Sequence, residues 1–273
     1  RTMPFQRYFW AVIVLSFAVA AMPLQNSPTW SSFCADDGWN QVWSDEFDGP
    51  SLDSTSWTID TASGDSRVRN STGTVDNVYL EGGALVLRSQ RQHSGNFSYT
   101  SGAVASQGKR SWQGLTRVCV SAMLPGGAVA NTAGGQGIWP AHWLMPDNDV
   151  CWPHSGEIDI MEMINGDGIL HGTYHYGPDC SVDKSSGGHT ALPTDWATNW
   201  HEYAVEYSPD HIAFAVDGKV YFKVSRFATL YDVPYYVILN TAVGGPWPGA
   251  PTKSTVFPTY HKIDYVRVSQ PKQ

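Results

Sequence analysis

The 273-residue sequence predicts an all-β domain, a sandwich or barrel of short antiparallel strands. Segments in which apolar and polar residues alternate are short, and Gly, Pro and Asp turns separate them at fairly regular spacing. No stretch shows the periodicity of an amphipathic helix, and no internal repeat is present. Because no linker rich in Pro and Ser divides residues 26–273, we expect one domain there.

The strands follow one another along the chain with turn residues between them. Residues 39–47 open the domain, and Glu81-Gly82-Gly83 is a turn between two early strands. We expect a Gly- and Ala-rich loop at 128–137 and a long polar loop up to Pro193. The expected strands are 77–80, 84–87, 116–124, 138–145, 157–162, 169–176, 202–207, 212–216, 220–224, the apolar segment 234–243, and 263–268.

The composition excludes some classes of partner. The net charge is -8 and only 15% of residues are charged, so a partner rich in phosphate, such as nucleic acid, is not expected. Aromatic residues make up 13% of the chain and include 12 Trp. This profile is typical of a globular protein with broad aromatic surfaces, and we expect a monomer.

Residues 1–25 differ from the rest of the chain. Arg1 and Arg7 precede an apolar run over 8–22, and small residues follow, so the segment predicts a secretory signal peptide cleaved between residues 20 and 25. The alternative is an uncleaved membrane anchor, but the run is short for a bilayer core of about 30 Å. We therefore expect a secreted, extracellular protein with no membrane contact after cleavage.

Four cysteines fit secretion, because an even number in a secreted chain indicates disulfides. Three connectivities are open. Cys151 and Cys180 bracket the segment described next, which favours their pairing and leaves Cys34 with Cys119. Sequons at 70–72 and 96–98 lie in polar, loop-like sequence and would suit glycosylation.

The segment 156–162 (Gly-Glu-Ile-Asp-Ile-Met-Glu) carries three carboxylates among large apolar residues. Strand alternation places Glu157 and Asp159 on one face and Glu162 on the other. A carboxylate pointing into an apolar layer costs several kcal/mol. We therefore predict a β-bulge at Ile160-Met161 that returns Glu162 to the face of the other two.

Carboxyl groups that share one cleft suit glycosidic bond cleavage, in which one attacks and another protonates the leaving oxygen. Three crowded carboxyls cannot all ionise cheaply, so at least one pKa should rise and keep an acid protonated near neutral pH. The alternative is a solvated edge strand with scattered acids, which the flanking Ile and Met residues disfavour.

Several further motifs accompany this segment in the same order as in glycoside hydrolase family 16, and the chain most resembles the laminarinase-like endo-β-1,3-glucanases of that family over roughly residues 40–268. The resemblance implies a two-sheet β-jelly roll with a substrate cleft across the concave sheet. It also implies no cofactor for catalysis. The matching motifs are 43–49 (WSDEFDG), 135–143 (GQGIWPAHW), 156–162 (GEIDIME), 200–207 (WHEYAVEY), 244–249 (GGPWPG) and 263–268 (IDYVRV).

By this resemblance Glu157 is the nucleophile, Glu162 the acid/base, and Asp159 the residue that tunes the pair. Two residues separate Asp159 from Glu162, which is similar to the laminarinase branch and unlike the bacterial lichenases. The expected reaction is retaining hydrolysis of internal β-1,3 bonds in laminarin-type β-glucans. Mixed-linkage β-1,3-1,4 hydrolysis and transglycosylation remain open. A non-catalytic glucan-binding protein is disfavoured, because such relatives typically lack both Glu residues.

Other side chains are candidates for sugar contact or for a structural ion. Aromatic rings can stack on sugar faces, although each could equally pack in the core. The expected substrate-binding residues are Trp139, Trp143, Trp152, Trp247, His175, Asn77, Arg117 and Asn240. Relatives often hold a structural calcium away from the cleft, and the matching positions here are Glu46, Gly83 and Asp264, whose oxygen atoms would suit a hard cation.

Overall fold

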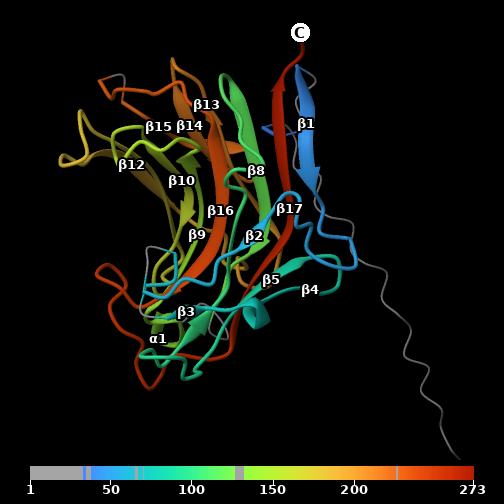
Figure 1. Cartoon of the computed structure of the whole chain (residues 1–273), viewed down its shortest axis with the longest axis vertical. Coiled ribbons are helices and arrows are strands. Elements are labelled where there is room, and N and C mark those ends of the chain that lie inside the picture. The colour runs from blue at the N-terminus through green and yellow to red at the C-terminus, as the bar shows by residue number, and fades with distance from the viewer. Residues whose placement is uncertain (1–32, 35–37, 65–66, 70, 127–131, 226) are drawn as a thin grey trace, which may run out of the picture.

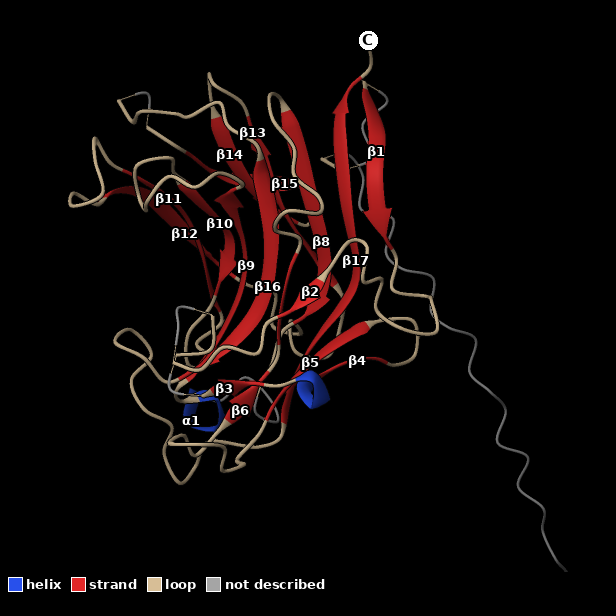
Figure 2. Cartoon of the chain, viewed as in Figure 1, coloured by secondary structure: helices blue, strands red, loops and turns tan. Residues whose placement is uncertain are grey.

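The computed structural model describes residues 33–34, 38–64, 67–69, 71–126, 132–225 and 227–273. The predicted signal peptide at 1–25 and Asn70 of the first sequon lie outside these residues. Two large, mostly antiparallel sheets pack face to face (Figure 1). Figure 2 shows that strands form both layers and that helix is confined to short turns.

The first sheet, called here the outer sheet, has the strand order β15-β14-β13-β8-β17-β5-β4, and β1 pairs with β17. Its long strand β17 crosses the whole layer and pairs with β1, β5 and β8 (Figure 1). The strands are β1 (Trp39–Asp45), β4 (Val78–Leu80), β5 (Leu85–Ser89), β8 (Thr116–Met123), β13 (His201–Tyr207), β14 (Ile212–Val216), β15 (Lys219–Lys223) and β17 (Thr259–Pro271).

The second sheet, called here the cleft sheet, has the order β12-β11-β10-β9-β16-β7-β2. The carboxylate strand β10 lies in its interior, between β9 and β11. The strands are β2 (Thr58–Ile59), β7 (Ala103–Ala105), β9 (Ile138–Pro146), β10 (Glu157–Glu162), β11 (Ile169–Tyr176), β12 (Lys184–Ala191) and β16 (Tyr235–Val243). Strands β3 (Thr72–Gly73) and β6 (Thr100–Ser101) form a small parallel pair beside it.

The core lies between the two sheets. Alternate residues of each strand point inward, so that Val118 and Val120 of β8 pack in the same cluster as Ile158 and Leu144 of the cleft sheet. Each of these four side chains is fully buried. Burial of apolar surface on this scale supplies most of the favourable free energy of folding, at roughly 25 cal/mol per Å². The rigid core therefore supports the cleft sheet from behind.

The all-β prediction is confirmed, and every expected strand is present within a few residues. The polar loop expected up to Pro193 is wrong in part, because Lys184–Ala191 forms β12 and pairs with β11 along its full length. Its polar sequence reflects its place at the edge of the sheet. Gly188 is needed there, since a Cβ atom would lie 2.4 Å from the ring of Phe222.

Other differences are small. A single helical turn, α1 (Thr132–Gly135), lies within the expected Gly- and Ala-rich loop, and a 3-10 turn, η1 (Val75–Asn77), precedes β4. The strands of two or three residues, β2, β3, β6 and β7, were too short to produce a visible alternation. Within the described part of the chain, no helix has the length and apolar character needed to cross a membrane.

The favoured disulfide pairing is confirmed. Cys34 bonds to Cys119 on β8, and Cys151 bonds to Cys180. The first bond attaches the segment before β1 to the outer sheet. The second joins the loop between β9 and β10 to the loop between β11 and β12, so that it ties together two segments at one end of the cleft sheet.

Candidate active site

The predicted β-bulge is present in β10. Glu157 lies opposite His175 and Asp159 opposite Thr173, but the register then shifts, so that Glu162 lies opposite His171. The pairing with β9 shifts in the same place. The side chains of Ile158, Ile160 and Met161 are all fully buried in the core between the sheets. Two consecutive residues thus point inward, and Glu162 returns to the face that carries Glu157 and Asp159.

The three carboxylates line one cleft with a volume of about 520 Å³ on the open face of the cleft sheet. Most of the lining comes from the central strands β9, β10 and β16. The lining residues are Arg67, Arg69, Trp139, Ala141, Trp143, Met145, Trp152, Glu157, Asp159, Glu162, Tyr236, Asn240 and Ala242.

Asp159 is the most buried carboxylate of the three, with 3% of its surface exposed. Its Oδ2 atom has no hydrogen-bond partner, and Nε2 of His175 lies 3.5 Å away. Burial raises the pKa of Asp159 well above its usual value, and the charges of Glu157 and Glu162 raise it further. Asp159 therefore holds a proton more tightly than an ordinary aspartate.

Glu162 is also shifted toward the protonated form. Burial and the charge of Glu157 raise its pKa to about 7, although the indole of Trp139 opposes them by donating a hydrogen bond of 2.9 Å to Oε1. Burial raises the pKa of Glu157 as well, while the nearby His175 and hydrogen bonds lower it. Near neutral pH the cleft thus holds both protonated and ionised carboxyl groups, as acid–base chemistry requires.

The model of glycosyl hydrolases family 16 matches residues 67–267, which contain the whole cleft and β10. The chain belongs to this family. The family includes enzymes of several specificities, so membership establishes a glycoside hydrolase and leaves the substrate to be argued separately.

Individual relatives of the family-16 chain are similar over most of its length. It is 32% identical to glucan endo-1,3-beta-glucosidase A1 of Niallia circulans over 85% of this chain, but it spans only 38% of that longer protein. It is 33% identical to a beta-glucanase of Rhodothermus marinus, over 84% of this chain and 85% of the relative. The laminarinase catalytic domain of Thermotoga maritima superimposes with a TM-score of 0.77 and 32% identity, covering 87% of this chain and 100% of that domain.

Four of the predicted substrate-binding residues line the cleft of this family-16 domain. Trp139, Trp143, Trp152 and Asn240 contribute to its walls. Trp143 donates to Asn240 Oδ1 at 2.7 Å, and the amide nitrogen of Asn240 donates to the backbone oxygen of Arg67 at 2.6 Å. These two hydrogen bonds therefore hold the side chains of Trp143 and Asn240 in the wall. Trp152, in contrast, is 44% exposed and offers its ring to a ligand.

Two more predicted residues lie at the margin of the cleft. Trp247 is 41% exposed, and its ring centroid is 5.3 Å from that of Trp139 and 5.0 Å from that of His171. The three rings form an aromatic wall beside Glu162, which pairs across the strands with His171. His175 lies at the other end of the carboxylate row, beside Asp159 and Trp152.

The prediction of substrate contact is wrong for Asn77 and Arg117. Asn77 is fully buried at the end of η1, where its side-chain oxygen accepts hydrogen bonds from Arg88 and Gln90. Arg117 belongs to the outer sheet and donates to Glu206 at 2.6 Å. Both side chains are occupied by structural partners away from the cleft. Arg117 was predicted because it resembles the Arg of an aromatic-Gly-Arg segment of the family, but Leu115 and Thr116 replace the aromatic residue and the Gly here.

The sequence interpretation missed three polar residues that line the cleft, namely Arg67, Arg69 and Tyr236. Arg67 pairs with Asp60 at 2.7 Å and donates to the hydroxyl of Tyr236 at 3.4 Å. The guanidinium of Arg69 lies 5.2 Å from the ring centroid of Trp139. Both arginines come from an irregular segment without strand periodicity, so no pattern placed them. The only available signal was the pair of arginines two residues apart in polar sequence.

The predicted calcium site combines Glu46, Gly83 and Asp264, and their contacts limit which oxygen atoms could bind an ion. Both carboxylate oxygens of Glu46 accept hydrogen bonds from Arg267, at 3.0 and 2.8 Å, so this side chain is not free to bind a cation. Asp264 lies at a register shift of β17, and its carboxylate accepts a hydrogen bond from Ser121 at 3.3 Å. Strand pairing brings the turn at Gly83 and the end of β1 toward the same part of β17. Only the Asp264 carboxylate and backbone oxygens would fit calcium.

Proposed function

We propose that the protein is a retaining endo-β-1,3-glucanase that hydrolyses laminarin-type β-glucans. One observation carries the proposal: the bulge in β10 brings Glu157, Asp159 and Glu162 to one face of an open cleft, with the pKa of Glu162 raised to about 7. Two carboxyl groups in opposite protonation states are the requirement of double displacement at an anomeric carbon. No cofactor takes part in these steps.

In the first step Glu157, ionised, attacks the anomeric carbon while Glu162 gives its proton to the glycosidic oxygen. The bond from the anomeric carbon to that oxygen breaks, and a glycosyl ester forms on Glu157. In the second step Glu162, now ionised, takes a proton from water as the water oxygen attacks the same carbon. The ester bond breaks, Glu157 is regenerated as a carboxylate, and the product keeps the β configuration.

Asp159 supports this cycle from its position between the two glutamates. Its raised pKa and its contact with Glu157 favour a proton shared within the pair. A protonated Asp159 donates a hydrogen bond to the Glu157 carboxylate and stabilises its negative charge when the glycosyl ester breaks. The same proton limits the negative charge near Glu162, so that Glu162 does not become too weak an acid.

The shape of the cleft and the relatives support the choice of substrate. Residues from several strands line the cleft. The exposed rings of Trp152 in its wall and of Trp247 at its margin suit the faces of successive glucose units. Relatives named as glucan endo-1,3-beta-glucosidase, beta-glucanase and laminarinase point to internal cleavage of β-glucans.

The test is a comparison of initial rates on laminarin and on lichenan, a mixed-linkage β-1,3-1,4-glucan. We expect laminarin to be cleaved faster, with internal cuts that release a range of oligosaccharides. Faster cleavage of lichenan would replace the proposed specificity by a mixed-linkage one, and the appearance of longer oligosaccharides would indicate transglycosylation. Binding of laminarin without any hydrolysis would overturn the proposal in favour of a recognition protein.

We also propose that the protein is secreted and acts as a monomer. Two disulfides support an oxidising compartment, and the predicted signal peptide gives a route to it. N-terminal sequencing of protein from the culture medium should find a start between residues 21 and 26, and size-exclusion chromatography should give a monomer. We further propose a structural calcium ion at Asp264. Its removal by EGTA should lower the melting temperature without changing kcat.

A further inference from the structure

His175 lies between two carboxylates that belong to different parts of the chain. On β11 it pairs across the strands with Glu157. Its Nδ1 atom lies 3.0 and 3.3 Å from the two carboxylate oxygens of Asp183, and its Nε2 atom lies 3.5 Å from Oδ2 of Asp159. The imidazole ring therefore connects the most buried acid of the cleft to an acid outside it.

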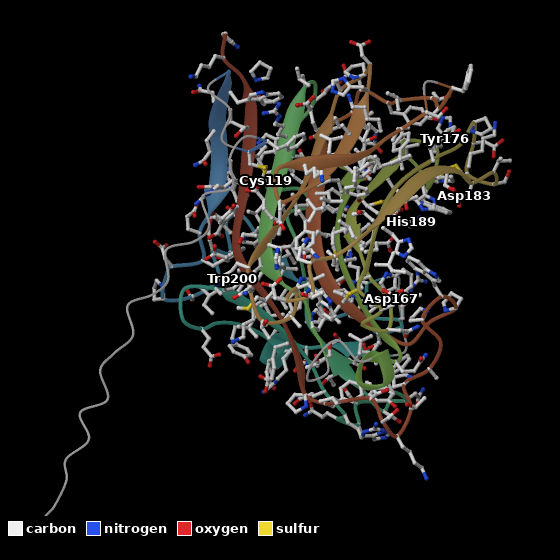
Figure 3. All side chains as sticks on the ribbon, turned by 180° about the vertical axis from the view of Figure 1, so that it is seen from behind. Cys119, Asp167, Tyr176, Asp183, His189 and Trp200 are labelled. Atoms are coloured by element: carbon white, nitrogen blue, oxygen red, sulfur yellow. A yellow bond between two sulfur atoms is a disulfide. The ribbon has the colours of Figure 1, made fainter. Side chains whose placement is uncertain are left out.

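Asp183 comes from the loop between β11 and β12, which carries no part of the carboxylate motif. In Figure 3 its label lies just below that of Tyr176, the last residue of β11, on the side of the molecule away from Cys119 of the outer sheet. Cys180 of the same loop is bonded to Cys151, in the loop that also carries Trp152. The ring centroid of Trp152 is 5.9 Å from that of His175. The disulfide thus joins the two loops that contact His175.

A carboxylate at one ring nitrogen decides what the other nitrogen can do. Asp183 accepts the hydrogen bond of Nδ1–H, so in the neutral ring Nε2 carries the lone pair, and in the charged ring it carries a second N–H. Either form suits Asp159, whose Oδ2 atom is buried and has no hydrogen-bond partner. A neutral His175 can take up the Asp159 proton, and a charged one can stabilise the Asp159 carboxylate.

We propose that Asp183 is a positioning residue of the catalytic site, which fixes the tautomer and orientation of His175 so that Nε2 faces Asp159. The inference rests on the proposed function for its catalytic consequence. The groups that face His175 are Glu157 and Asp159 from β10, Asp183 from its own hairpin and the indole of Trp152, with Glu162 in electrostatic reach. Asp183 acts through His175 and does not contact the substrate, because it does not line the cleft.

The kinetic test uses Asp183→Asn, which keeps the size of the side chain but removes its charge. We expect kcat on laminarin to fall about tenfold, with KM little changed and the pH profile of kcat displaced. Asp183→Glu should restore part of the rate. The matched control is Asp179→Asn, because Asp179 lies in the same loop and its carboxylate accepts hydrogen bonds from the backbone and hydroxyl of Ser181. It should keep the wild-type profile. An Asp183→Asn enzyme with wild-type kcat and pH profile would overturn the proposal.

The second measurement needs no catalytic activity. Nitrogen-15 NMR of protein labelled in His, with the signal of His175 assigned through His175→Asn, reports which ring nitrogen carries the proton. The neutral ring should be the Nδ1–H tautomer in the wild type and should revert to Nε2–H, the form preferred by free imidazole, in Asp183→Asn. An unchanged tautomer overturns the proposal. A changed tautomer in a protein that hydrolyses no β-glucan supports this contact while the proposed function fails.

Discussion

Two carboxylates at the outer sheet, Glu46 and Glu206, are opposite in protonation behaviour to the three carboxylates of the cleft. In the cleft, burial raises the pKa of Glu157, Asp159 and Glu162, and the charge of Glu157 raises the pKa of the other two further. On the outer sheet, burial would raise the pKa of Glu206, but hydrogen bonds from His211 and Arg117 outweigh it and lower the pKa. Hydrogen bonds from Arg267 likewise lower the pKa of Glu46.

The difference shows what separates a structural acid from a functional one in this fold. On the outer sheet, Glu206 accepts a short hydrogen bond from the guanidinium of Arg117. Glu46 accepts two from Arg267, so the charged form of each of these two acids is stable. The cleft sheet places three acids on one face and surrounds them with indole rings. The cleft therefore keeps ionisation incomplete near neutral pH, which lowers stability and supplies the proton for catalysis.

The largest expected contrast is in activity. Glu157→Ser should lower kcat on laminarin by about 10⁴-fold or more, because no group remains to form the glycosyl ester. Laminarin binding, measured by affinity electrophoresis, should persist. The matched control is Glu206→Gln on the outer sheet, which should keep wild-type kcat at neutral pH. Equal losses of activity in both variants would show that the contrast between the sheets is not functional.

The second contrast is in stability. Glu162 has a folded-state pKa of about 7, above its usual value of 4.5, so the folded protein binds the extra proton and stability falls as pH rises from about 4.5 to 7. The side chain in Glu162→Gln cannot titrate, so the variant should not lose this stability as the pH rises. After allowance for proton sharing among the three acids, we expect the variant to be about 2 kcal/mol more stable than wild type at pH 8 and no more stable at pH 4.5. Urea unfolding at the two pH values measures the difference.

For Glu206 on the outer sheet, the change of stability with pH should have the opposite sign. The pKa of Glu206 is lowered, so its stabilisation is complete above the unfolded-state pKa and is lost as pH falls through the folded-state value. Glu206→Gln leaves Arg117 and His211 without their acid and should destabilise the protein by about 1 kcal/mol at pH 7. The deficit should disappear in acid, once Glu206 is protonated in the folded protein as well. A deficit that persists unchanged in acid would mean that packing, and not charge, holds this site.

The smallest effect concerns one hydrogen bond. The indole of Trp139 donates to ionised Glu162 and so lowers its pKa. Trp139→Phe removes the donor, and the loss of activity at alkaline pH should move upward by about half a pH unit. The displacement should appear in kcat at saturating laminarin, where weaker sugar stacking has little influence. A shift toward lower pH would contradict the assignment of Glu162 as the acid.

Sequence reasoning predicted much of this site because its parts lie on one regular strand. The alternation of Ile158 and Ile160 with the acids fixed the expected faces, and the cost of burying Glu162 required the bulge. Disulfide pairing followed from the position of Cys151 and Cys180 around that strand. In each case a local pattern carried the information, and the structure agrees with it.

Other parts of the site depend on contacts distant in sequence. Arg67 and Arg69 reach the cleft from an irregular segment, and Asp183 meets His175 only because β12 pairs with β11. The strand β12 itself was hidden, since an edge strand can be polar on both faces. Arg117 was assigned to the cleft because it resembles the Arg of a family motif that the chain matches only in part, and its strand lies in the other sheet.

The central claim is that Glu157 and Glu162 act as nucleophile and acid/base across one cleft. Proton NMR during the first minutes of laminarin hydrolysis, before mutarotation is complete, tests it most directly. Double displacement predicts that the reducing ends appear first as the β anomer, followed by slow equilibration with the α anomer. First formation of the α anomer would contradict the account, because inversion needs a water molecule at the position assigned here to Glu157.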